Sequence, residues 1–180
     1  MVLAVPAPPA RYAGARMTAA VYGSDVTDSV NFLSNPPFAT LTVTTPQAGP
    51  ASSGAPNVAL QFDTEVDDTY NGHSTSTNNS RYTAVVAGRY RVRAAVCWNP
   101  NVTGARVMQL YKNGSAVAYA QVQFPAAPAT NFSIPELNAT VYLAVGDYIE
   151  AWVGQNSGGA LAIVAAGTAM QIAWEHAALL

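Results

Sequence analysis

Cysteine and histidine are frequent catalytic residues, and this sequence has one cysteine, Cys97, and two histidines, His73 and His176. A nucleophile needs a base within hydrogen-bond reach, and a serine nucleophile often sits in a sharp Gly-x-Ser-x-Gly turn. The sequence has no such turn, and its histidines lie in a polar stretch and near the C-terminus. We therefore expect no catalytic residue, two solvated or interfacial histidines, and a buried cysteine that behaves as a small apolar side chain.

Four carboxylates gather in one short polar stretch, at Asp63, Glu65, Asp67 and Asp68. Alternating carboxylates in a loop can hold Ca²⁺ together with backbone carbonyls, but the spacing of an EF-hand is absent. A pair of carboxylates can also hydrolyse glycosides, yet nothing nearby predicts a sugar-binding cleft. We expect no metal site and no cofactor, and we leave calcium binding by this loop open.

Three arginines alternate along one predicted strand, at Arg89, Arg91 and Arg93. Alternate side chains of a strand share a face, so the three guanidinium groups repel one another unless something neutralises them. Acids on a neighbouring strand could do so, with Glu150 as a candidate. A contact between subunits could also do so, because arginine tolerates burial through forked pairing. An anion or a glycan is the third alternative.

A second predicted strand, from Tyr148 to Gln155, is largely apolar on both faces. In a sandwich, one face of each strand meets the core and the other meets water. Aromatic residues on both faces therefore favour a subunit interface that covers the outer face. The candidate interface residues from the two strands are Arg89, Arg91, Arg93, Tyr148, Glu150 and Trp152.

From Phe38 onward the sequence has the pattern of strands and turns. Asn113-Gly114 predicts a two-residue hairpin turn, whereas the polar segment 63–80 is too long for a tight turn and predicts a surface loop. About eight to ten strands at short spacing predict an all-β fold, an antiparallel jelly-roll sandwich. We expect four aromatic side chains to be buried in it: Tyr90, Trp98, Trp152 and Trp174.

The first part of the chain differs from the rest. The prolines of residues 1–17 predict an extended arm, and residues 18–33 predict one short helix, capped by Ser24 or Asp25 and ended by Asn35-Pro36-Pro37. The helix could pack on the main domain or attach the protein to a partner. The candidate attachment residues are Arg11, Tyr12, Val26, Val30, Phe32 and Leu33. We divide the chain into an arm and helix, residues 1–45, and a jelly-roll domain, residues 46–180.

The composition excludes several functions. The chain is 50% hydrophobic and only 10% charged, with a net charge of −2, so it lacks the basic surface with which proteins bind nucleic acid. Its longest apolar run, Leu161 to Ala166, is shorter than the roughly 18 residues of a membrane span. With so few charges, copies of the chain repel one another little, and we expect part of the surface to be buried between copies.

Three short motifs in order, Gly88-Arg-Tyr-Arg-Val, Tyr111-Lys-Asn-Gly and Leu143-Ala-Val-Gly-Asp-Tyr-Ile-Glu-Ala-Trp-Val, carry a resemblance. Over roughly residues 58–174 the chain resembles the trimeric jelly-roll family of the complement first-component globular head and tumour necrosis factor, as found in bacteriophage structural proteins. The resemblance implies a homotrimer around a threefold axis. It carries over no catalytic residue.

The N-terminal motifs Thr18-Ala-Ala-Val-Tyr, Asp28-Ser-Val-Asn-Phe-Leu and Pro36-Pro37-Phe-Ala-Thr-Leu are similar to a segment of virion proteins from phages that infect actinobacteria. This resemblance implies a non-enzymatic structural protein on the virion surface, bound to a tail or major capsid protein. We expect a minor tail or tail-tip protein. A capsid decoration protein or head fibre, and a module that binds a host cell-surface glycan near Tyr70 and Tyr82, are the alternatives.

Overall fold

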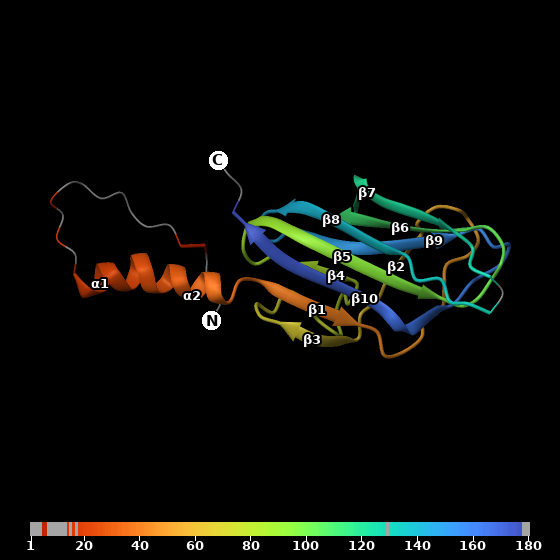
Figure 1. Ribbon diagram of the computed structural model, residues 1–180, viewed down its shortest axis with the longest axis horizontal. Helices are drawn as coiled ribbons and strands as arrows, with labels where there is room; N and C mark the ends of the chain where they lie inside the picture. Colours follow the sequence, from red (N-terminus) through yellow and green to blue (C-terminus); the bar gives the residue numbers. More distant parts are fainter. Residues whose placement is uncertain (1–4, 7–13, 15, 17, 129, 178–180) are drawn as a thin grey trace.

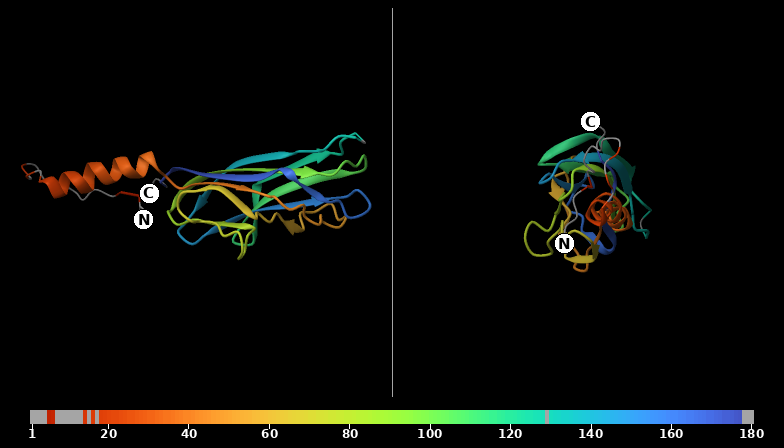
Figure 2. Two further views of the ribbon diagram at one scale, coloured as in Figure 1. Left: turned by 90° about the horizontal axis from the view of Figure 1, so that it is seen from below. Right: turned by 90° about the vertical axis from the view of Figure 1, so that its left-hand side faces the viewer.

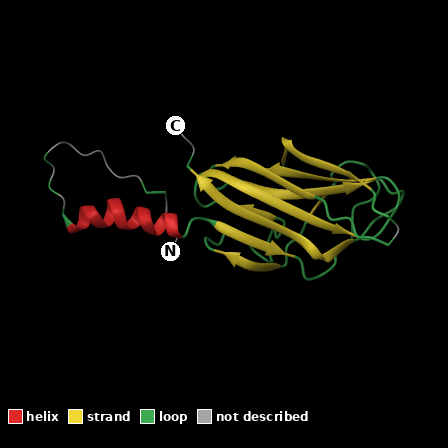
Figure 3. Ribbon diagram, in the orientation of Figure 1, coloured by secondary structure: helices red, strands yellow, loops and turns green. Residues whose placement is uncertain are grey.

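The computed structural model describes residues 5–6, 14, 16, 18–128 and 130–177, and its main body is a sandwich of two antiparallel sheets (Figure 1, Figure 3). The first sheet has the strand order β3-β1-β10-β5-β8, and the second has the order β2-β9-β6-β7, with β4 paired to β9. The strands are β1 (Phe38–Thr42), β2 (Val58–Ala59), β3 (Thr64–Asp68), β4 (Arg81–Thr83), β5 (Gly88–Trp98), β6 (Ala105–Lys112), β7 (Ser115–Pro125), β8 (Glu136–Leu143), β9 (Tyr148–Gln155) and β10 (Ile163–His176). The predicted all-β antiparallel sandwich is confirmed.

The core lies between the two sheets and follows from the alternation within each strand. On β5, Tyr90, Val92 and Trp98 are fully buried, whereas the arginines between them point outward. The expected burial of Tyr90 and Trp98 is confirmed, but that of the other two tryptophans is wrong in part. Trp152 lies half-buried on the outer face of β9, and Trp174 lies half-buried at the end of β10, beneath the helix.

The hairpin between β6 and β7 forms at the predicted turn. Asn113 has φ 50° and Gly114 has φ 76°, the left-handed conformation that a two-residue type I′ turn requires at both positions. The side chain of Asn113 also accepts a hydrogen bond from the backbone N–H of Tyr148. The turn is thereby joined to the start of β9.

The segment 63–80 is only in part the surface loop that its polarity predicts, because residues 69–80 form a loop and residues 64–68 a strand. Its first part forms β3, which pairs with β1 in the register Ala39↔Asp68 and Thr40↔Asp67. Without β3, the outer edge of β1 would leave backbone groups unpaired. Long-range pairing thus overrides the polar composition.

The helix covers almost the predicted residues 18–33, but its N-cap differs from the predicted one. It consists of α1 (Ala19–Tyr22), a π-helical turn η1 (Gly23–Thr27) and α2 (Asp28–Ser34). Thr18 is the N-cap, because its hydroxyl accepts a hydrogen bond from the backbone N–H of Val21 at 3.3 Å. Ser24 and Asp25, the predicted caps, lie inside the π-helical turn. The helix ends at Asn35, before Pro36, as predicted.

The helix projects from one end of the sandwich, roughly along its long axis (Figure 2). No helix in the described part of the chain is both long and apolar enough to cross a membrane. The helix leads directly into β1, which is the second strand of the first sheet. The division of the chain at residue 45 stays a prediction, but β1 lies inside the sandwich.

Candidate functional site: two sheet faces and a helix

We call the solvent-facing side of the first sheet the first outer face, and its main feature is the arginine row of β5. The Arg91 Nε lies 3.2 Å from an oxygen of Glu175 on β10. The Arg93 Nη2 donates to both oxygens of Glu136 on β8, at 2.7 and 2.8 Å. The prediction that Glu150 neutralises these arginines is wrong, because Glu150 lies on β9, which belongs to the second sheet. Acids on the neighbouring strands of the same sheet neutralise two of the three arginines.

The first outer face is open and shallow. Two hollows, of about 250 and 530 Å³, share Arg93, Glu136 and Gln171 in their walls. Much of the remaining lining is short: Thr40, Ala95, Ala169 and Ala173. Short side chains leave the sheet accessible to another flat surface.

The second outer face, the solvent-facing side of the second sheet, is built around a buried carboxylate. Glu150 is only 4% exposed. It accepts hydrogen bonds from the Ser80 hydroxyl at 2.6 Å, the Arg81 Nε at 3.1 Å and the Trp152 Nε1 at 3.2 Å. The Arg81 guanidinium also lies 4.1 Å from the centre of the Tyr148 ring, a cation–π contact. Both oxygens of Glu150 are therefore engaged within one chain.

Aromatic stacking and a loop cover more of the second outer face. The rings of Tyr111 and Trp152 stack with their centres 4.9 Å apart and their planes at 28°. Farther along β9, a Cβ on Gly154 would lie 2.0 Å from the carbonyl oxygen of Ala55. The loop around Ala55 therefore rests on the sheet there. In the sequence, the apolar outer face of β9 favoured a subunit interface. In the structure, contacts within the chain cover much of that face.

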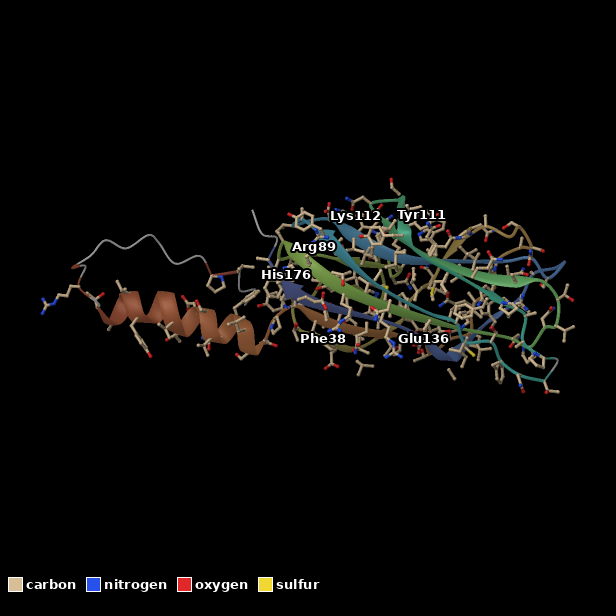
Figure 4. All side chains as sticks on the ribbon, turned by 45° about the horizontal axis from the view of Figure 1, so that its top comes forward. Phe38, Arg89, Tyr111, Lys112, Glu136 and His176 are labelled. Atoms are coloured by element: carbon tan, nitrogen blue, oxygen red, sulfur yellow. The ribbon has the colours of Figure 1, made fainter. Side chains whose placement is uncertain are left out.

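The six candidate interface residues do not form one surface. Arg89, Arg91 and Arg93 lie on β5 of the first sheet, whereas Tyr148, Glu150 and Trp152 lie on β9 of the second. The outer faces of the two sheets point in opposite directions. Arg89 and His176 lie close together at the end of the sandwich nearest the helix (Figure 4). Sequence reasoning missed Ser80, Arg81 and Tyr111. A usable signal was that Tyr111 on β6 and Glu150 on β9 each alternate with apolar residues.

His73 is not solvated, which corrects that prediction. Its side chain is fully buried, with Nδ1 2.9 Å from Glu65 Oε1 and Nε2 3.1 Å from the carbonyl oxygen of Asn79. Its backbone N–H donates to Asp68 at 2.8 Å. The loop after β3 folds back on the strand, so His73 fastens that loop. His176 is exposed.

The acidic stretch serves different local purposes. Asp63 accepts hydrogen bonds from the backbone N–H and hydroxyl of Thr44 and the N–H of Thr45, which lower the pKa of Asp63 to about 2. Glu65 binds His73, and Asp68 accepts backbone N–H groups. Within the described residues, no three His, Cys, Asp or Glu side chains are arranged to hold a metal ion.

Three further side chains are out of reach of a ligand. Tyr70 is 3% exposed and Tyr82 is fully buried, so neither ring is available to stack on a glycan. Cys97 is buried as predicted, and burial raises the pKa of its thiol.

The helix has one exposed apolar stripe. Tyr22, Val26, Val30 and Leu33 are 54%, 37%, 57% and 69% exposed. Phe32 does not belong to the stripe: it is 1% exposed, and its ring meets Trp174 edge-on with the centres 4.9 Å apart. Phe32 fastens the helix to the sandwich instead. The predicted attachment residues Arg11 and Tyr12 lie outside the described residues.

The sequence matches no family model and no curated protein. The structure is similar to the globular domain of zebrafish complement 1qA protein, with a TM-score of 0.53 and 12% identity, over 79% of this chain and 99% of that one. It is also similar to murine APRIL at pH 8.5, with a TM-score of 0.54 and 12% identity, over 77% of this chain and 98% of that one. The fold is therefore a jelly roll of the complement-head and tumour-necrosis-factor type, which confirms the predicted fold class.

Proposed function

We propose that the protein is a non-enzymatic structural component of a tailed bacteriophage virion, a homotrimer that displays its jelly-roll head on the particle surface. The N-terminal arm and helix attach the protein to the particle, at the tail or tail tip. The resemblance of the N-terminal motifs to a segment of virion proteins supports the phage assignment. The jelly-roll fold supports the homotrimer, because the family that the chain resembles forms threefold assemblies.

The exposed stripe of the helix is the observation that carries the proposal. Four large apolar side chains, Tyr22, Val26, Val30 and Leu33, face solvent on a helix that projects from the sandwich (Figure 2). Exposed contiguous apolar surface marks an interaction site. Phe32, and not the stripe, holds the helix to the sandwich. The stripe is therefore free to contact a partner on the particle.

The first outer face supports self-association. It has short side chains and shallow hollows, in contrast to the second outer face, which the loop around Ala55 and the Tyr111–Trp152 stack partly cover. Flat, uncovered sheet surface allows the close packing that an interface requires. We place the contact between copies on the first outer face.

The test separates attachment from assembly. A variant with Val26→Ser, Val30→Ser and Leu33→Ser keeps Phe32, so its jelly roll folds. We expect it to retain the mass of a trimer by light scattering after gel filtration and to lose incorporation into particles. A control with Thr27→Ser and Asn31→Ser, both at exposed polar positions of the helix, is expected to incorporate normally.

Two outcomes would overturn the proposal. Normal incorporation of the stripe variant would mean that the helix does not attach the protein. A monomeric wild-type protein would remove the homotrimer. Separating heads from tails before detection gives the location, and detection on heads would favour the capsid decoration alternative over the tail.

A further inference from the structure

Charged side chains are few in the sandwich, and nearly all have a partner. The pairs and bonded groups are Arg81–Glu150, Arg91–Glu175, Arg93–Glu136, Lys112–Asp147, His73–Glu65, Asp63 and Asp68 with backbone N–H groups, and Arg106 with backbone carbonyls. Among the described residues of the sandwich, two charged side chains are left without a hydrogen bond or an ion pair. They are Arg89 and Asp67, and they have opposite signs.

Arg89 and Asp67 both lie on the first outer face. Asp67 is opposite Thr40, Thr40 is opposite Gln171, and Gln171 is opposite Arg93. Residues directly opposite one another across antiparallel strands share a face, and Arg89 shares the face of Arg93 through the alternation of β5. Both side chains are exposed.

The two charges cannot pair within one chain. Asp67 lies on the edge strand β3 and Arg89 on β5, three strands away in the sheet order. At about 4.8 Å per strand, this separates the two backbones by about 14 Å across the sheet. The offset of four residues along β5, from Arg93 to Arg89, adds about 13 Å along the strands. No rotamer of either side chain spans that distance.

We propose that Arg89 of one copy forms an ion pair with Asp67 of the next copy, across the contact between subunits. The inference rests on the proposed homotrimer and names a pair of residues in its interface. A closed ring is built from heterologous contacts, in which each copy contributes two different patches. Asp67, at the β3 edge, and Arg89, near the β8 edge, provide two such patches with complementary charge.

The surroundings of Arg89 suit a carboxylate from a neighbour. Its partners in register are Tyr142 on β8 and His176 on β10, and both are exposed. Figure 4 shows Arg89 and His176 at the end of the sandwich beside the helix. Arginine presents a planar fork that binds a carboxylate through two hydrogen bonds. Among the described residues, no acid forms an ion pair or a hydrogen bond with Arg89.

A charge swap tests the pair. The variants are Arg89→Glu, Asp67→Arg and the double variant with both changes. Asp28→Arg is the control for Asp67→Arg, because it makes the same charge change at an exposed position of the helix. Sedimentation over a series of concentrations gives the concentration at which half of the chains are assembled. We expect each single variant to raise it at least tenfold, the double variant to return to within threefold of wild type, and the control to match wild type.

The outcomes separate this inference from the homotrimer. A wild-type trimer whose double variant is no better than the single variants would overturn the ion pair and leave the homotrimer standing. A wild-type dimer with full rescue in the double variant would support the ion pair and overturn the homotrimer. A wild-type monomer would overturn both. Circular dichroism of each variant confirms that a lost assembly is not a lost fold.

Discussion

The two outer faces of the sandwich use charge in opposite ways. On the first outer face, the ion pairs Arg91–Glu175 and Arg93–Glu136 are accessible to solvent, and the Arg93 and Glu136 side chains are 55% and 51% exposed. On the second, Glu150 is buried and receives three hydrogen bonds from its own chain. Exposed ion pairs contribute little to stability, whereas a buried carboxylate is costly to leave without its partners. The second face stabilises the subunit, whereas the ion pairs of the first face remain exposed.

Removing the buried carboxylate is the change with the largest expected effect. Glu150→Ala leaves Ser80 and Arg81 without their acceptor, and we expect it to lower the free energy of unfolding by about 3 kcal/mol. The matched change on the first face, Glu136→Ala, is expected to cost less than about 1 kcal/mol. Urea denaturation followed by tryptophan fluorescence measures both. Equal losses would contradict the contrast between the faces.

The loop over the second outer face gives a smaller effect. Gly154→Ala places a Cβ 2.0 Å from the carbonyl oxygen of Ala55, so the loop has to move off the sheet. We expect a loss of about 2 kcal/mol, as for an overpacked core position, and faster proteolysis between residues 50 and 57. Gly146→Ala is not a suitable control, because Gly146 has φ 86°. Gly159→Ala is suitable, because a Cβ there meets no atom within 4 Å.

Acid should destabilise the sandwich through two carboxylates in its connecting segments, Asp63 and Asp147. Lys112, Asn113 and the backbone N–H of Ala144 lower the pKa of Asp147 to about 2, as Thr44 and Thr45 do for Asp63. A carboxylate whose pKa is lower in the folded protein than in the unfolded chain stabilises the fold when the pH is above its ordinary pKa of 3.8. That stability is lost as the pH falls from about 4 to about 2. Thermal unfolding from pH 5 to pH 2 measures the slope, which should flatten in Asp147→Asn and in Asp63→Asn.

The smallest effect is the coupling between Arg93 and Glu136. A double-mutant cycle with Arg93→Gln and Glu136→Gln, measured on the dissociated subunit, should give a coupling of less than about 1 kcal/mol. A much larger coupling in the subunit would contradict the exposed first face. A larger coupling in the assembled protein alone would indicate that assembly buries the pair.

Several features were predictable because they depend on neighbours in the sequence. The alternation of Tyr90, Val92 and Trp98 with the arginines gave β5 and its buried face, and Asn113-Gly114 gave the hairpin. The Pro36 that ends the helix acts on the residue next to it. Each of these signals is local, since side-chain direction on a strand alternates with every residue.

Most of the strands, the residues on each of their two faces, and hence the class of the fold could be read from the sequence, although β3 was missed. Which strands share a sheet depends on the tertiary structure. Glu150 was on the correct face of a correctly predicted strand, yet it meets Arg81 and not the arginine row, because β9 and β5 belong to different sheets. Alternation sets which face a side chain occupies, but strand order depends on pairings between distant segments. The burial of His73 and the unpaired state of Arg89 follow from those pairings.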